Sequence, residues 1–106
     1  MPKYLIQASY TAEGAKGLLK DGGSKRRQVA EQAMQSAGGT MEAFYFAFGD
    51  TDVYVIVDAP DHATVSAASL AINASGAVHT RTVVLITPEE IDEAVKKAVT
   101  YQAPGS

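Results

Sequence analysis

The sequence predicts an α+β domain in which strands and helices follow the order βαββαβ, with one further helix at the C-terminus. Three observations predict this class. Alternating apolar and polar residues mark four strands, apolar residues at helical spacing mark the helices, and glycine pairs or capping residues separate the segments. Right-handed crossovers then place both main helices on one face of a four-stranded antiparallel sheet, with spatial strand order 4-1-3-2.

The first part of the chain contains one strand and two helical segments. Residues 3–10 alternate in the manner of a half-buried strand. Thr11 is a favourable N-cap for a short helix, which the Gly22-Gly23 pair is expected to end. Ser24 is expected to cap a second helix that runs to about residue 37 and ends at Gly38-Gly39.

The second part begins with a predicted hairpin. Residues 42–48 are rich in aromatic residues, residues 49–52 form a turn, and residues 53–57 form the next strand. A helix of small residues follows from Pro60-Asp61 to about residue 74, and residues 77–86 form the fourth strand. All of residues 1–106 are therefore expected to form a single domain.

The C-terminal helix has a strong start. Thr87-Pro88-Glu89-Glu90 combines a capping box with proline at the first helical position. Ile91, Val95 and Val99 then recur at helical spacing and predict an apolar stripe. Residues 102–106 are expected to form a loose tail.

Both faces of the predicted hairpin are apolar. The alternation groups Phe44, Phe46 and Phe48 on one face of their strand, and Tyr54 and Ile56 on one face of the next. Two helices can cover only one face of a sheet, so the other face needs the C-terminal helix or the sheet of a second copy. We therefore expect a homodimer or larger oligomer in which Phe44, Phe46 or Tyr54 becomes buried.

Composition narrows the function classes. The 106 residues carry nine Lys and Arg against twelve Asp and Glu, a formal net charge of −3, which argues against nucleic-acid binding. The absence of cysteine excludes disulfides and thiolate chemistry. No apolar run reaches the length of a membrane span, and the polar start does not resemble a secretion signal. We expect a cytoplasmic protein with no membrane partner.

The sequence also resembles the bacterial GYD-domain proteins over nearly its whole length. The resemblance rests on residues 4–11, 14–26, 43–49 and 52–57, and on Ala77-Val78 together with residues 85–90. It implies the ferredoxin-like fold of the dimeric α+β-barrel type. The Gly-x-Tyr-Asp motif that names the family is here Gly49-Asp50-Thr51-Asp52, so Thr51 replaces the tyrosine.

One candidate ligand site is a basic segment at the start of the second helix. Lys20, Gly23, Ser24 and Arg27 are the candidate anion-binding residues, because glycine lets backbone N–H groups approach a ligand and a helix N-terminus attracts anions. Neighbouring Lys25 and Arg26 add charge that opposes the helix dipole unless an anion is bound. A solvated surface loop is the alternative interpretation.

A second constellation is a candidate catalytic site. His79 and Arg81 alternate onto one face of the fourth strand, where Tyr45 and Asp52 can approach them. An imidazole beside a carboxylate serves as a general base near neutral pH. The alternative is that Arg81 pairs with a carboxylate and His79 lies at an interface. The two histidines have no ligand-like spacing, so we predict no metal and no cofactor.

These patterns leave two functions open. The first is a small-molecule-binding protein or enzyme, with a pocket for a small anionic or aromatic ligand on the sheet face or between protomers. The alternative is a non-enzymatic regulatory or assembly module whose sheet face serves only homo-oligomerisation. The sequence does not decide whether the domain is an enzyme.

Overall fold

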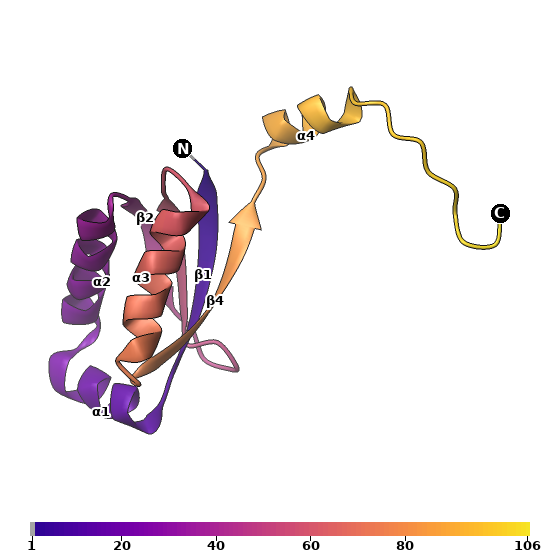
Figure 1. Cartoon of the computed structure of the whole chain (residues 1–106). Coiled ribbons are helices and arrows are strands. Elements are labelled where there is room, and N and C mark those ends of the chain that lie inside the picture. The colour runs from indigo at the N-terminus through magenta and orange to yellow at the C-terminus, as the bar shows by residue number, and fades with distance from the viewer. Residues whose placement is uncertain (1) are drawn as a thin grey trace.

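A computed structural model describes residues 2–106 and contains one four-stranded antiparallel sheet (Figure 1). The strand order is β2-β3-β1-β4, which confirms the predicted arrangement. The elements along the chain are β1 (Lys3–Tyr10), α1 (Ala12–Asp21), α2 (Gly23–Ala37), β2 (Thr40–Phe46), β3 (Val53–Asp58), α3 (His62–Ala74), β4 (Val78–Leu85) and α4 (Pro88–Val95).

The core lies between the sheet and helices α2 and α3, which cover the same face (Figure 1). In β1 the residues Tyr4, Ile6 and Ala8 point toward the helices, and β3 adds three valines to this layer. Met34 of α2 and Val65 of α3 close the core from the helix side. The period-2 alternation of the strands therefore decides which face the helices cover.

Helices α1 and α2 follow one another with only Gly22 between them. The prediction that Ser24 caps α2 is wrong: α2 begins at Gly23, and its N-cap is Gly22, which has no side chain to accept a hydrogen bond. Gly22 has a φ of 81°, and its N–H donates to the carbonyl of Leu18. This left-handed conformation lets one glycine end α1 and start α2.

Strand β2 differs from its predicted course. It begins at Thr40 and ends at Phe46, two residues earlier than expected at each end, and it contains an irregularity between Met41 and Ala43. The loop between β2 and β3 is closed by a hydrogen bond of 2.7 Å from the Ala47 N–H to the Asp52 carbonyl. Phe48 therefore lies outside the sheet, fully exposed in the loop.

The predicted grouping of Phe44 with Phe46 and of Tyr54 with Ile56 is confirmed, whereas Phe48 lies outside the strand. Phe44 and Phe46 pair with Val55 and Val53, so they share the helix-covered side of the sheet. Tyr54 lies on the opposite side, where Tyr45 is its direct cross-strand neighbour. Alternation within one strand shows which of its residues share a face, but it does not show which face of the neighbouring strand they lie on.

Helix α4 projects away from the body of the domain (Figure 1). It ends at Val95, short of the expected Val99, and makes no extensive contact with any other described helix or strand. The radius of gyration is 17.0 Å, against about 13 Å for a compact domain of this length. The sheet face opposite the helices is therefore not covered by α4.

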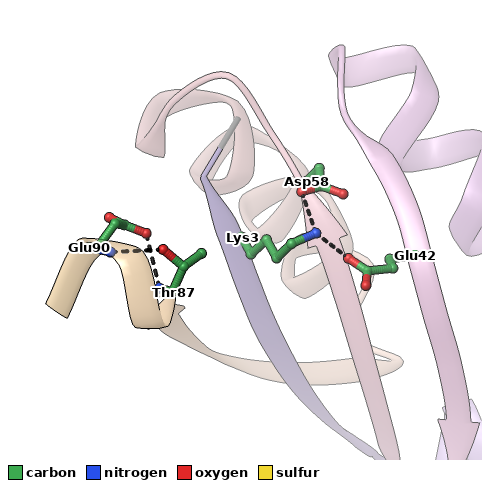
Figure 2. A network of polar contacts seen from close by, with 5 residues as sticks. All are labelled: Lys3, Glu42, Asp58, Thr87 and Glu90. Atoms are coloured by element: carbon green, nitrogen blue, oxygen red, sulfur yellow. Dashed lines mark hydrogen bonds and ion pairs between the residues drawn. The ribbon is translucent and has the colours of Figure 1, made fainter. Parts of the chain in front are cut away.

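Figure 2 shows two sets of polar contacts near the end of the sheet where β1 begins and β4 ends. Lys3 bridges Glu42 and Asp58, with 3.0 Å between its Nζ and the Asp58 carboxylate, and so links three strands. The hydroxyl of Thr87 accepts the Glu90 N–H while the Glu90 carboxylate accepts the Thr87 N–H, which is the predicted capping box. Within residues 2–106, none of the helices has the length and apolar character needed to span a bilayer.

Candidate binding surface

The sheet face opposite α2 and α3, called the open face from here on, is the most extensive unassigned surface of the domain. Its residues point away from the core because each alternates with a core residue along its strand. All four strands contribute large apolar or aromatic side chains to it, and polar side chains lie between these and at both ends. The open face comprises Lys3, Leu5, Gln7, Ser9, Ala43, Tyr45, Tyr54, Ile56, Asp58, His79, Arg81, Val83 and Leu85.

A continuous row crosses the middle of the open face through all four strands. Tyr45 lies opposite Tyr54, Tyr54 lies opposite Gln7, and Gln7 lies opposite Arg81. Tyr45 is 71% exposed and Tyr54 is 39% exposed. The sheet register therefore gathers two of the predicted catalytic residues, Tyr45 and Arg81, into one row, separated by the width of two strands.

His79 lies next to this row, opposite Ser9 on β1. The side chain of Ser9 donates to the Asp50 carbonyl at 2.9 Å, which ties the hairpin loop to this corner of the sheet. Among the described residues, neither His79 nor Arg81 forms an ion pair with a carboxylate. A general-base role for His79 stays a prediction.

Asp52, the predicted carboxylate partner, has a structural position. Its side chain accepts the Tyr10 N–H at 2.8 Å, and its own N–H donates to the Ala8 carbonyl at 2.9 Å. Neighbouring Thr51 is 6% exposed, and its hydroxyl lies 3.4 Å from the Gln7 amide oxygen. Residues 51 and 52 thus fasten the hairpin loop to β1, and Thr51 contacts Gln7 of the central row.

The predicted anion-binding residues lie on the far side of the molecule, at the α1–α2 junction. Gly23, Ser24 and Arg27 line a shallow hollow together with Phe44 and Phe46. A Cβ on Gly23 would come 3.0 Å from the Phe46 ring, so the ring packs directly on the start of α2. Lys20 is exposed in the last turn of α1. Anion binding at this junction stays a prediction.

Arg26, the neighbouring cation, is engaged within the chain. Its guanidinium lies 3.7 Å from the Asp21 carboxylate. Burial raises the pKa of the nearby Tyr10 hydroxyl, and Arg26 acts in the opposite direction. The basic segment is therefore partly neutralised without an added anion.

Sequence reasoning missed a groove on the helix side, between α3 and β4. It encloses about 590 Å³ and is lined by Leu70, Val65 and Val84, with Tyr4 and His62 at one end. The Tyr4 hydroxyl lies 2.7 Å from His62 Nδ1, and the two rings meet edge to face. His62 thus provides the hydrogen-bond partner that a buried tyrosine needs. Helical spacing gave no sign of this contact, because the two residues are 58 positions apart.

No group of three or more histidine or acidic side chains placed to hold a metal occurs among residues 2–106. The polar residues of the open face are instead spread between apolar and aromatic ones. Such a flat, mixed surface suits contact with another macromolecule better than enclosure of a small ligand.

Comparison with known proteins agrees with this topology. The model of the GYD domain family matches residues 4–95, which spans all four strands and α4. The chain belongs to the GYD domain family. No solved structure matches it significantly.

One curated relative of this GYD-domain protein comes from Thermus thermophilus. It is 30% identical over 82 residues, which cover 77% of this chain and 85% of the relative. That protein is named glutamine synthetase and cystathionine beta-lyase binding protein. A protein-binding role within the family is therefore on record for a chain of similar extent.

Proposed function

We propose that this GYD-domain protein is a non-catalytic protein-binding module, and that its open face is the surface on which a partner protein docks. The observation that carries the proposal is the uncovered row from Tyr45 and Tyr54 to Arg81. Tyrosine and arginine are the residue types, with tryptophan, that contribute most binding energy at protein interfaces. Leu5 and Ile56 lie in the row beside them and supply apolar area.

The relative supports a heterologous partner. Its name describes binding to glutamine synthetase and to cystathionine beta-lyase, and the match covers 77% of this chain. We therefore propose glutamine synthetase as the first partner to test for this chain. Phe48, fully exposed in the loop that follows β2, offers a further aromatic side chain for contact with a partner.

A second copy of the chain is the other protein that can cover the open face, by two-fold packing of one sheet on another. The resemblance to dimeric α+β-barrel proteins implies this use. Packing of a second copy on the open face would exclude simultaneous docking of an enzyme on the same residues. The two occupants are separated by measuring self-association and enzyme binding on the same variants.

Small-molecule binding on the sheet face has less support. The hollows lined by Leu70, by Gly23 and by Ala33 all lie on the helix side of the sheet. The Asp52 carboxylate accepts the Tyr10 N–H, and among the described residues no carboxylate forms an ion pair with His79 or Arg81. An acid–base reaction on the open face would need groups from another chain.

The test is a calorimetric titration of the purified chain with purified glutamine synthetase, which measures the Kd of their complex. Tyr45→Ala removes an exposed tyrosine from the open face, and Tyr101→Ala removes one of similar exposure, 75%, from the C-terminal tail. Loss of a hot-spot tyrosine costs about 2 kcal/mol, or about 30-fold in Kd. We expect that loss for Tyr45→Ala and an unchanged Kd for Tyr101→Ala. Equal effects of both substitutions, or no binding by the wild-type chain, would overturn the proposal.

A further inference from the structure

We propose that an interior cavity between α2 and the sheet binds a small monocarboxylate, with the apolar tail of the ligand inside and its carboxylate on Arg26 and Tyr10 at the mouth. The cavity has a volume of about 80 Å³ and is lined by α2, α3 and the core face of the sheet. It is separate from the open face, so the inference does not depend on the proposed enzyme partner.

The cavity arises where small residues lie on both the helix and the sheet. Arg26, Ala30 and Met34 recur every four residues along α2 and therefore lie on one face of the helix. On β1, Ala8 precedes Tyr10 by two positions and shares the core face with it. Both alanines line the cavity. Each supplies only a methyl group where a larger side chain would fill the space, so a void remains between helix and sheet.

The mouth of the cavity is at the end of the sheet where β1 ends and β4 begins, beside α1 (Figure 1). Tyr10 and Arg26 line this end and are partly exposed, whereas Met34 and Val57 toward the opposite end are 4% and 1% exposed. A ligand that enters from this end therefore passes the hydroxyl and the guanidinium before it reaches the apolar interior.

The interior of the cavity suits an apolar group better than water. Among the described residues, Thr80 is the one polar side chain in the lining besides the pair at the mouth. Its hydroxyl already accepts a hydrogen bond of 2.7 Å from the Asn73 amide. A buried water needs about two to four polar partners, and apolar cavities without them stay dry. Hydrocarbon that fills this space therefore displaces little bound water.

The volume limits the length of the apolar tail. An apolar cavity of about 150 Å³ accepts benzene, which corresponds to about 25 Å³ for each carbon atom, so this cavity holds about three to four carbon atoms. Met34 and Met41 line it, and the flexible side chain of methionine adapts to the shape of a ligand. Butyrate and isovalerate are the acids whose tails match this size.

The mouth supplies hydrogen-bond donors for the carboxylate. The ion pair of Arg26 with Asp21 measures 3.7 Å, longer than the roughly 2.8 Å of a charge-assisted hydrogen bond, and a guanidinium has further N–H groups to donate. Burial raises the pKa of the Tyr10 hydroxyl, so this hydroxyl stays protonated and able to donate at neutral pH. Arg26 favours negative charge at the Tyr10 oxygen more strongly than the Asp52 carboxylate opposes it. A ligand carboxylate at the mouth is therefore attracted by Arg26 and hydrogen-bonded by Tyr10.

Nuclear magnetic resonance of the full chain with isotope-labelled methionine methyl groups tests the proposal, because Met34 and Met41 line the cavity. We expect isovalerate to shift both methyl signals saturably in the millimolar range. Each buried methylene contributes about fourfold to affinity, so isovalerate should bind about 60-fold more tightly than acetate. The uncharged isovaleramide should bind about tenfold more weakly than isovalerate, because it lacks the charge-assisted hydrogen bonds.

Two substitutions and one control locate the site. Arg26→Gln should abolish the preference for isovalerate over its amide, whereas Arg27→Gln, which removes the same charge outside the cavity lining, should keep it. Ala30→Leu should fill the cavity and weaken isovalerate binding about tenfold or more. Circular dichroism checks the folding of each variant, and the partly exposed Arg26 keeps the test valid if Ala30→Leu is unfolded.

Three results would overturn the proposal. The first is the absence of a saturable shift of the Met34 and Met41 signals throughout the millimolar range. The second is an equal affinity of the wild type for isovalerate and isovaleramide, or a preference that survives Arg26→Gln. The third is a folded Ala30→Leu variant with an unchanged Kd, which would place the acid outside the cavity.

Discussion

Gly14 offers a sharp test of how α1 packs, because the structure leaves no room there for a side chain. It is a buried glycine in the first turn of α1, and a Cβ built on it would lie 2.0 Å from the carbonyl oxygen of Ala77 and 2.8 Å from the Tyr10 ring. The close approach is held by Thr11, whose N–H donates to that Ala77 carbonyl and whose hydroxyl donates to Gly76. Backbone on both sides of the contact means that neither partner can turn away.

The magnitude follows from two opposing terms. Overpacking costs about 1–3 kcal/mol, and a backbone contact this short places Gly14→Ala at the upper end. The better helix propensity of alanine returns about 1 kcal/mol, which leaves a net loss of about 2 kcal/mol. An unfolding entropy of about 0.22 kcal/mol per kelvin for a chain of this length converts the loss to a Tm about 9 °C lower.

Gly17, one turn further along the same helix, is the matched control. A Cβ on it would have no heavy atom within 4 Å, so Gly17→Ala should gain about 0.5–1 kcal/mol and raise the Tm by a few degrees. Thermal unfolding followed by circular dichroism measures both. A Gly14→Ala variant that melts at or above the wild type would refute the packing of α1 against the α3–β4 turn.

Two further substitutions separate stability from binding. Asp61 caps α3 by accepting the Thr64 N–H at 2.8 Å, and this hydrogen bond lowers the pKa of the Asp61 carboxyl. The stabilisation that the ionised carboxylate gives the folded state should be complete above about pH 4. It should be lost as the pH falls through the lowered pKa. Asp61→Asn should remove that part of the acid dependence in denaturation curves from pH 2 to 6, and identical curves would contradict it. Phe46→Ala should cost about 1–2 kcal/mol in urea unfolding because the ring packs on Gly23, while a large loss of enzyme binding without loss of stability would place Phe46 at the docking surface.

Local patterns predicted the elements well where capping and alternation agree. The Thr87 capping box, the Thr11 cap and the alternation of β1 are each properties of a few adjacent residues, and all are confirmed. The strand order also followed, because crossover handedness leaves few alternatives for βαββαβ.

Features that depend on the pairing of distant segments were not predictable in the same way. The pairing of β2 with β3, whose register shifts between Met41 and Ala43, places Phe44 and Phe46 on the helix side. The Tyr4–His62 contact and the role of Asp52 in holding Tyr10 join residues more than 40 positions apart. Of the predicted catalytic residues, the register aligned Tyr45 with Arg81 but gave Asp52 a structural bond.

The position of α4 shows the same limit. The apolar stripe of α4 indicates that the helix packs against another apolar surface, and α4 makes no extensive contact with the described helices and strands of its own chain. Whether the stripe folds back or crosses to another copy depends on contacts outside the single sequence. The sequence alone therefore identifies a helix that needs a partner but not the partner.

Photo-crosslinking from the centre of the open face tests the central claim most directly. Tyr54 is replaced by benzoylphenylalanine, the protein is irradiated with glutamine synthetase, and the adducts are identified by intact mass. We predict an adduct of one chain with one synthetase subunit, and none when the same group replaces Leu19 on α1. Adducts that contain only two copies of the chain, or synthetase adducts from Leu19 alone, would contradict docking on the open face.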